Sequence, residues 1–228
     1  KAVLSRRPTV SPEAEMERLA RLEIETFTIR DPGYPHLLRE VYEYPPVLYV
    51  KGKILPEDER SVTVVGTRKP TAYGREVAHQ IAGDLARSGV TIVSGLARGI
   101  DAVAHRAALE AGGRTLAVLA NGLDTVYPPE HASLAQEICR RGALISEHPL
   151  GVRPEAKNFP RRNRILSGLT PGTVVVEAGE GSGVLHTVKY ALEQDREVMA
   201  VPGSILSPAS REANRLIQNG AKMVLHYT

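Results

Sequence analysis

The sequence predicts a doubly wound α/β domain, built on a mostly parallel sheet with helices on both faces. From Ser61 onward, short apolar and β-branched runs alternate with helical stretches. Continuous apolar strands separated by helices are typical of a parallel sheet that is covered on both faces. Hydrophobic residues make up 42% of the 228 residues, which is enough for one sizeable core.

The predicted elements follow one another in a regular order. Ser11 as N-cap and Pro12 at the first helical position indicate a short helix, which we assign to an N-terminal extension. Residues 27–54 are rich in Pro and Tyr, and we expect them to pack as an extension with one short helix and a strand at VLYVKG. We divide the chain into a lead-in and helix, residues 1–26, and one domain, residues 27–228. Further strands are expected at SVTVVG, GVTIVSG, TLAVLA, GALISE, GTVVVEA, REVMAV and KMVLHY, and helices from about Gly74, Ile100, His131, Gly183 and Ser210.

Composition sets limits on location and partners. The formal net charge is only +3, too small an excess to establish a nucleic-acid partner, so the clustering of cations matters more. A single cysteine, Cys139, excludes an internal disulfide and fits a reducing compartment. No apolar run approaches the ~20 residues that span a bilayer, and residues 1–20 lack the apolar stretch of a signal peptide. We expect a cytoplasmic protein with no membrane partner, a flexible lead-in at residues 1–10, and a fragment, because the chain begins without Met.

Glycine-containing turns follow several of the predicted strands, and three of these turns carry candidate binding residues. Ligands of doubly wound sheets bind beyond the carboxyl ends of the strands, near the point where strand order reverses. Gly66-Thr67-Arg68 follows the first of these strands, and there a glycine backbone and an arginine favour a phosphate. Arg98 follows the next strand between two glycines, and Ser182-Gly183 lies in a third turn. The alternative for Arg68 is a plain tight turn with a solvated side chain.

The acids and histidines near these turns suggest no complete catalytic site. Asp101 is most simply a helix cap, and a metal or acid–base pair with His105 lacks a third ligand. Glu177, at the end of a strand, is either a ribose-binding residue of an enzyme or a partner for an arginine. The GEGSG turn that follows it departs from G-x-G-x-x-G, and the sequence has no P-loop. We predict no catalytic residue, no metal and no cofactor.

A cationic segment lies between two of the predicted strands. Lys157, Arg161, Arg162 and Arg164 occur within a stretch without acids, residues 156–176. Arg161 and Arg164 are three apart on a predicted helix start and share a face, whereas Arg162 points elsewhere and is a candidate for a structural role.

Phe159 precedes this helix start and has two possible roles. A base stacked on it would contribute about 1–3 kcal/mol, and the alternative is a core residue that anchors the loop. An arginine-lined crevice with an aromatic edge fits a run of phosphates and bases. A binding module is therefore favoured over an enzyme.

Seven motifs in a fixed order carry a resemblance to a known family. From about Phe27 to the C-terminus the chain resembles the bacterial DNA-processing protein A family, also called Smf. The resemblance implies a Rossmann-like fold, sequence-independent binding of single-stranded DNA in natural transformation and recombination, loading of the RecA recombinase, and a homodimer without enzymatic activity. The motifs are VVGTRKPTAYG, VSGLARGIDAVAH, LAVLANGLDTVYP, LISEHPLG, NFPRRNRILSGL, VVVEAGEGSGVLHT and REVMAVPG.

The resemblance also implies a set of DNA-binding residues. They lie in the turn after the first strand, in the cationic segment and in the last glycine turn: Gly66, Thr67, Arg68, Phe159, Arg162, Asn163, Arg164, Ser182 and Gly183, with Arg161 at a variable position. To these the cation pattern adds Arg98 and Lys157.

The chain departs from the family pattern at three places. They are Val184-Leu185-His186 after the last glycine turn, Asn121, and Glu212 in a late loop. We expect the first two to touch the rim of the pocket. The rival hypothesis is a nucleotide-binding enzyme of the lysine-decarboxylase-like phosphoribohydrolase type, although its P-G-G-x-G-T turn is absent.

Overall fold

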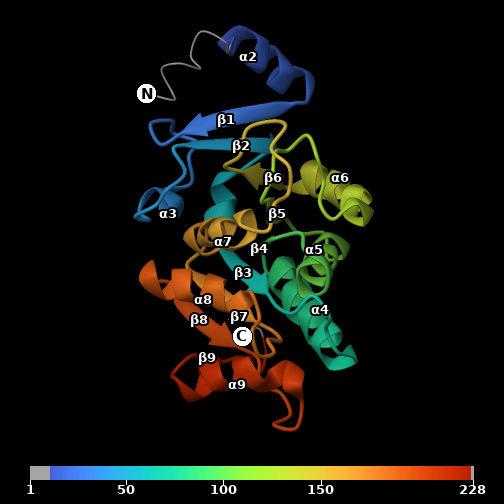
Figure 1. The fold of residues 1–228 in the computed structure, drawn as a ribbon. Coiled ribbons are helices and arrows are strands. Elements are labelled where there is room, and N and C mark those ends of the chain that lie inside the picture. The colour runs from blue at the N-terminus through green and yellow to red at the C-terminus, as the bar shows by residue number, and fades with distance from the viewer. Residues whose placement is uncertain (1–10, 227–228) are drawn as a thin grey trace.

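A computed structural model describes residues 11–226 of the chain, and the expected lead-in at residues 1–10 lies outside them. Within the described residues the strands form one nine-stranded sheet in the order β1-β2-β6-β5-β4-β3-β7-β8-β9. Figure 1 shows this sheet running through the whole molecule, with α2 and β1 at one end and α9 at the other. The predicted α/β fold class is confirmed.

The sheet is parallel except at one edge. β2 pairs antiparallel with both β1 and β6, and the pairs from β6 through β8 to β9 are parallel. The strands are β1 (Ile24–Thr28), β2 (Val47–Gly52), β3 (Ser61–Val65), β4 (Thr91–Ser94), β5 (Thr115–Val118), β6 (Ala143–Ser146), β7 (Gly172–Val175), β8 (Glu197–Ala200) and β9 (Lys222–Met223).

Helices cover both faces of the sheet, as predicted. Buried side chains of α3, α7, α8 and α9 pack on one face, and those of α4, α5 and α6 pack on the other; Figure 1 shows α7 and α8 on the opposite side of the sheet from α4, α5 and α6. The α-helices are α2 (Pro12–Arg21), α3 (His36–Arg39), α4 (Ala72–Arg87), α5 (Ile100–Glu110), α6 (Ala132–Arg141), α7 (Asn158–Gly168), α8 (Val184–Glu193) and α9 (Arg211–Gln218), and the 3-10 helices are η2 (Pro56–Glu59), η3 (Pro129–His131) and η4 (Pro208–Ser210).

Two helices begin at side-chain caps. Ser11 Oγ accepts the backbone N–H of Ala14 at 3.2 Å, which confirms the predicted start of α2. Thr71 Oγ1 accepts the N–H of Gly74 at 3.0 Å, so α4 begins two residues before the predicted start at Gly74. This cap fixes the chain that leaves β3 and thereby positions the turn between strand and helix.

The sequence did not predict strand β1. It lies in a segment where we expected the end of the N-terminal extension, and it pairs along its whole length with β2. The predicted division at residues 26 and 27 falls inside this strand. Leu19 and Ile24 bury their side chains in the same hydrophobic cluster as α6, so α2 and β1 pack directly against the sheet domain.

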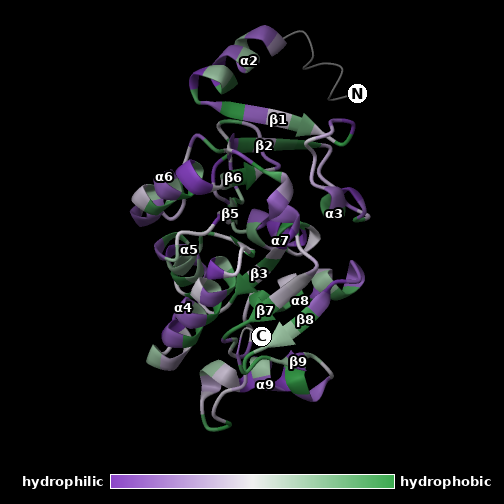
Figure 2. Cartoon of the chain, turned by 180° about the vertical axis from the view of Figure 1, so that it is seen from behind, coloured by the Kyte–Doolittle hydropathy of each residue, from purple (hydrophilic) through white to green (hydrophobic). Residues whose placement is uncertain are grey.

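The strand order reverses between β3 and β7. The chain builds β4, β5 and β6 on one side of β3, then crosses to β7, β8 and β9 on the other side. Connections therefore leave the carboxyl ends of β3 and β7 in opposite directions, which opens a crevice there. Helix α7 covers this part of the sheet, and Figure 2 shows it as strongly hydrophilic beside the hydrophobic strands.

Candidate functional site

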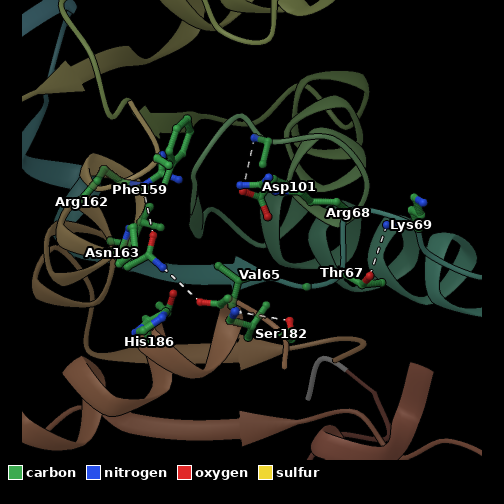
Figure 3. Close-up of a pocket in the computed structure, with 18 of the residues that line it drawn as sticks. Val65, Thr67, Arg68, Lys69, Asp101, Phe159, Arg162, Asn163, Ser182 and His186 are labelled. Atoms are coloured by element: carbon green, nitrogen blue, oxygen red, sulfur yellow. Dashed lines mark hydrogen bonds between the residues drawn. The ribbon is translucent and has the colours of Figure 1, made fainter. Parts of the chain in front are cut away.

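A pocket of about 730 Å³ opens at this reversal point. Its walls come from the turns after β3 and β7, from the start of α5 and from α7, as the close-up in Figure 3 shows. Eight of the residues predicted from the sequence line it: Gly66, Thr67, Arg68, Phe159, Arg162, Asn163, Ser182 and Gly183. The turns and the cationic segment, which are distant in sequence, therefore meet at one site.

The turn after β3 is held rigidly by its neighbours. The Thr67 N–H donates to Glu177 O at 2.7 Å, and Thr67 O accepts the N–H of Ile100 at 3.2 Å. A Cβ at Gly66 would overlap the side chain of Ile100, so this glycine is required by the packing of α5 against the strand end. The rigid turn places Arg68 and Lys69 at the pocket.

Arg68 and Phe159 form the exposed wall of the pocket. The guanidinium carbon of exposed Arg68 lies 5.6 Å from the ring centroid of Phe159, and Tyr127 packs on that ring with centroids 5.7 Å apart. Phe159 is half-buried and lines the pocket, so it is not enclosed in the core. A cation and an aromatic face are thus presented together.

Arg162 lines the pocket and is only 4% exposed. Its Nη1 donates to Gly95 O at 2.9 Å and to Val118 O, which ties α7 to the carboxyl ends of β4 and β5. A Cβ at Gly95 would lie 2.6 Å from Arg162 Nη2, so the glycine admits the guanidinium. Burial lowers the pKa of Arg162 to about 10, and it remains a cation at neutral pH.

Asp101 supplies the negative charge beside Arg162. It is 5% exposed, and its Oδ2 accepts the N–H groups of Gly95 at 3.1 Å and Ala97 at 3.4 Å. Burial raises the pKa of Asp101, and the charge of Arg162 opposes that shift. The carboxylate therefore occupies backbone donors that an anionic ligand would otherwise use.

Arg161 and Arg164 share a face of α7, as their spacing predicts, but neither lines the pocket. The side chain of Arg164 is 3% exposed and binds Glu147 through both terminal nitrogens, at 2.9 and 2.7 Å. Arg161 Nε lies 3.9 Å from the same carboxylate. The helix instead turns Arg162 and Asn163 toward the pocket. The face that carries Arg161 and Arg164 lies against Glu147, which follows β6.

The two remaining predicted cations also lie outside the lining of the pocket. Arg98 Nε is 2.5 Å from Glu130 Oε1, and Lys157 Nζ is 2.7 Å from Glu155 Oε2. All of these side chains are largely exposed, so the pairs are surface ion pairs of small energetic effect.

The last glycine turn joins the pocket to α8. Ser182 Oγ accepts the N–H of Val184 at 3.4 Å, and Asn163 Nδ2 donates to Gly183 O at 3.4 Å. Asn163 therefore connects α7 with the start of α8. In Figure 3, His186 lies beside Asn163 at this wall. Lys69 and Tyr127 line the pocket but were not predicted from the sequence.

The titratable groups considered for catalysis are engaged elsewhere. His105 is fully buried, its Nδ1 is 2.6 Å from Thr115 Oγ1, and burial lowers its pKa to about 3. The carboxylate of Glu177 accepts both the hydroxyl and the N–H of Thr71, at 2.6 and 2.9 Å, rather than pairing with an arginine, which was one of the two roles that the sequence left open. Among residues 11–226, no group of three or more His, Cys, Asp or Glu side chains could hold a metal ion.

Of the two departures from the family pattern that were expected at the rim of the pocket, one lies there and the other does not. Val184 and His186 line the pocket as expected. Asn121 is 1% exposed and absent from the lining, which corrects the expectation that it touches the rim. Its Nδ2 donates to Gly122 O at 2.9 Å and to Thr125 O at 2.6 Å, so it holds together the loop that carries Tyr127.

Comparison with known proteins assigns the family. Residues 25–228 match the family described as DNA recombination-mediator protein A. The chain belongs to this family. The resemblance to DNA-processing protein A, or Smf, that its seven motifs indicate is confirmed.

Members of this DNA-processing family share both sequence and fold with the chain. DNA processing protein DprA of Bacillus subtilis (strain 168) is 45% identical over 202 residues, covering 88% of this chain and 68% of that protein. The structure of DNA processing protein A from Streptococcus pneumoniae has a TM-score of 0.89 at 38% identity, covering 98% of this chain and 78% of the other. The chain spans between 51% and 68% of the length of the first curated relatives that it matches.

A third relative is described for its ligand. DNA processing protein A of Helicobacter pylori, described for a unique single-stranded DNA binding mode, has a TM-score of 0.81 at 26% identity, covering 91% of this chain and 94% of the other. Within residues 11–226 of the present family member, no helix is long and apolar enough to cross a membrane.

Proposed function

We propose that the chain binds single-stranded DNA in the pocket at the reversal point, with little preference for sequence. The observation that carries this proposal is the pairing of free cations with an aromatic face. Arg68 and Lys69 line the pocket without an acidic ion-pair partner among residues 11–226, and Arg68 lies 5.6 Å from the Phe159 ring. Phosphates need exposed cations, and bases stack on aromatic rings regardless of identity.

The residues take different roles in this proposal. Arg68 contacts a phosphate, the backbone at Gly66 and Thr67 approaches the sugar–phosphate chain, and Phe159 stacks on a base. Asn163, Ser182 and Gly183 form the opposite wall. Arg162 and Arg164 position α7, since both are buried and bound to protein acceptors. Contacts of this kind place the backbone of a strand and carry little sequence information.

We extend the proposal to the setting in which the family acts. The chain binds DNA that enters during natural transformation, loads the RecA recombinase onto it and works in the cytoplasm as a homodimer. The family description as a recombination mediator and the Helicobacter pylori relative support this extension. Exposed Arg98, Lys157 and Arg161 then contact more distant phosphates of a longer strand.

A binding role is favoured over the rival phosphoribohydrolase. That enzyme needs an acid free to meet a ribose, and Glu177 is 1% exposed with both oxygens bound to Thr71. Asp101 is likewise engaged by backbone N–H groups. Release of a free base from a nucleoside monophosphate would support the enzyme instead.

The proposal is tested by equilibrium binding of a fluorescent oligo-dT of about 20 nucleotides, compared with duplex across a salt series. We expect tight binding of the single strand, and for Arg68→Ala weaker binding whose slope of log K against log salt falls by about 0.7. Arg87→Ala, an exposed arginine at the far end of α4, is the matched control and should leave the slope unchanged. Absence of binding at low salt, or a loss confined to particular sequences, would contradict the proposal.

A further inference from the structure

Lys69 is the last residue before α4 that lines the pocket, and the chain runs from it through Pro70 and Thr71 into that helix. Lys69 is exposed at the pocket, and its backbone N–H donates to Thr67 Oγ1 at 3.2 Å. Figure 3 shows Lys69 and Phe159 at opposite sides of the pocket, with Arg68 and Asp101 between them. A strand that stacks one base on Phe159 and extends beyond Arg68 therefore leaves the pocket beside Lys69.

Tyr73 follows Lys69 in the first turn of α4. Its side chain is 48% exposed, and its hydroxyl donates to Pro202 O at 2.7 Å. This bond joins the start of α4 to the loop after β8 and restrains the ring at its far end. A restrained, half-exposed ring loses little conformational freedom when a base packs on it, unlike a freely rotating surface tyrosine.

A second cation lies against the same turn. Arg75 Nη1 donates to Pro70 O at 2.7 Å, so its guanidinium is held over the segment between Lys69 and Tyr73. Neither Lys69 nor Arg75 has an acidic ion-pair partner among the described residues 11–226. In the sequence, Tyr73 lies between these two cations, so an aromatic ring and cations occur near each other beside the pocket, as Phe159 and Arg68 do within it.

We propose that Tyr73 is the stacking platform of a second nucleotide subsite, with Lys69 and Arg75 as its phosphate contacts. The inference rests on the proposed binding of single-stranded DNA and extends it from one stacked base to two separate ones. Aromatic platforms and cations in alternation are what a strand requires, because its bases and phosphates alternate. The subsite sets the shortest strand that binds with full affinity.

The composition of the chain offers a direct probe, because it contains no tryptophan. Tyr73→Trp makes a protein with a single indole at the subsite, and Tyr42→Trp places the only indole at a side chain that is 98% exposed in another loop. We expect saturating oligo-dT of about 20 nucleotides to quench the fluorescence of Tyr73→Trp and leave that of Tyr42→Trp unchanged. An oligonucleotide of abasic sites, which keeps the phosphates, should give no quenching.

Affinity measurements on two further variants separate the ring from its anchor. Tyr73→Ala removes the ring and should weaken binding of the oligo-dT by about 10-fold, with no change for an oligonucleotide too short to reach past Lys69. Tyr73→Phe keeps the ring and should bind within a factor of about three of wild type. Thermal unfolding of both variants checks that the fold is retained.

The outcomes distinguish the two proposals. If wild type fails to bind oligo-dT, the proposed function itself is wrong. If wild type binds, but Tyr73→Trp shows no quenching and Tyr73→Ala retains full affinity, the second subsite is wrong and the pocket at Arg68 stands. Equal weakening of short and long oligonucleotides by Tyr73→Ala would also overturn the subsite, since it would place Tyr73 within the first one.

Discussion

The cations of α7 are buried or paired with acids, whereas those of the turn after β3 are exposed at the pocket. Arg162 and Arg164 on α7 are 4% and 3% exposed and bind protein acceptors. Arg68 and Lys69 on the turn are exposed and have no acidic ion-pair partner among residues 11–226. The clustered arginines of α7 therefore hold the site together. The cations that are available to a ligand lie on the short turn after β3.

The difference follows from the energetics of burying charge. A buried cation is tolerated only when an acid and hydrogen-bond acceptors replace its water. Arg164 has the bidentate carboxylate of Glu147, and Arg162 has two backbone carbonyls with Asp101 nearby. Such cations hold α7 in place, and the nitrogens that make these bonds are not available to a phosphate. The comparison teaches that exposure, more than the number of arginines, decides which cations are available to a ligand at this site.

The largest effect should come from breaking the buried ion pair. Arg164→Ala leaves Glu147, whose side chain is 8% exposed, without its bidentate partner. We expect the free energy of unfolding to fall by about 3–5 kcal/mol, measured by urea denaturation. Because the substitution acts through the fold, residual folded protein should keep the salt slope of wild type.

A double substitution controls for the orphaned carboxylate. Arg164→Met with Glu147→Gln removes both charges and should recover most of the lost stability. If Arg164→Ala is as stable as wild type and flattens the salt slope, Arg164 contacts phosphate and belongs with the exposed cations.

A buried base without an acid partner provides the second test. His105 is fully buried, Arg162 adds to the unfavourable field, and its pKa is lowered to about 3. The pKa of histidine in the unfolded chain is about 6.5, so between these values the unfolded state binds the extra proton. Stability from this group is complete above the unfolded value and is lost as pH falls toward the folded one.

We expect the free energy of unfolding to fall by about 2 kcal/mol between pH 7 and pH 5 because of His105. His105→Gln should lose this part of the pH dependence, which urea denaturation at both pH values measures. Equal pH dependence in the variant and in wild type would show that His105 is protonated in the folded protein at pH 5, and that a buried cation needs no acid here.

Local patterns predicted most of the sheet but not its antiparallel edge. The apolar runs from Ser61 onward predicted the parallel strands, because those of β3, β4, β5 and β6 are buried along their whole length and read as continuous. Strand β1, at Ile24–Thr28, has a mixed burial pattern at the edge of the sheet and follows α2 within a few residues. Its pairing with β2 depends on residues that are distant in the sequence, so local periodicity could not predict it.

The site was predicted in outline and not in detail. Strand ends with glycine and arginine located the pocket, because ligands of such sheets bind there. Helical spacing could not tell which arginine of α7 is buried, since the partner of Arg164 is Glu147, 17 residues away. Lys69 follows Arg68 directly and was available from the same strand-end argument, whereas Tyr127 reaches Phe159 only through the folding of its loop.

The smallest effect should come from exchanging the buried guanidinium for an ammonium. Arg162→Lys keeps the charge near Asp101 but cannot span both Gly95 O and Val118 O, which Arg162 Nη1 reaches now. We expect the free energy of unfolding to fall by about 1.5 kcal/mol, the value of one charged hydrogen bond, measured by urea denaturation. Oligo-dT affinity should fall modestly while the slope of log K against log salt stays that of wild type.

The slope of log K against log salt distinguishes the cations that contact phosphate from those that only stabilise the fold, because it reports the number of phosphate contacts and not stability. Arg68→Ala should flatten the slope without changing the unfolding free energy. Arg162→Lys should lower the unfolding free energy without changing the slope. Lysine keeps a positive charge, so Arg162→Gln completes the test: its slope should also equal that of wild type if no phosphate reaches position 162. A slope lower by about 0.7 in Arg162→Gln would mean that the strand enters deeply enough to displace Gly95 O or Val118 O from the guanidinium. The division between architectural and ligand-binding cations would then depend on the bound state rather than on burial in the free protein.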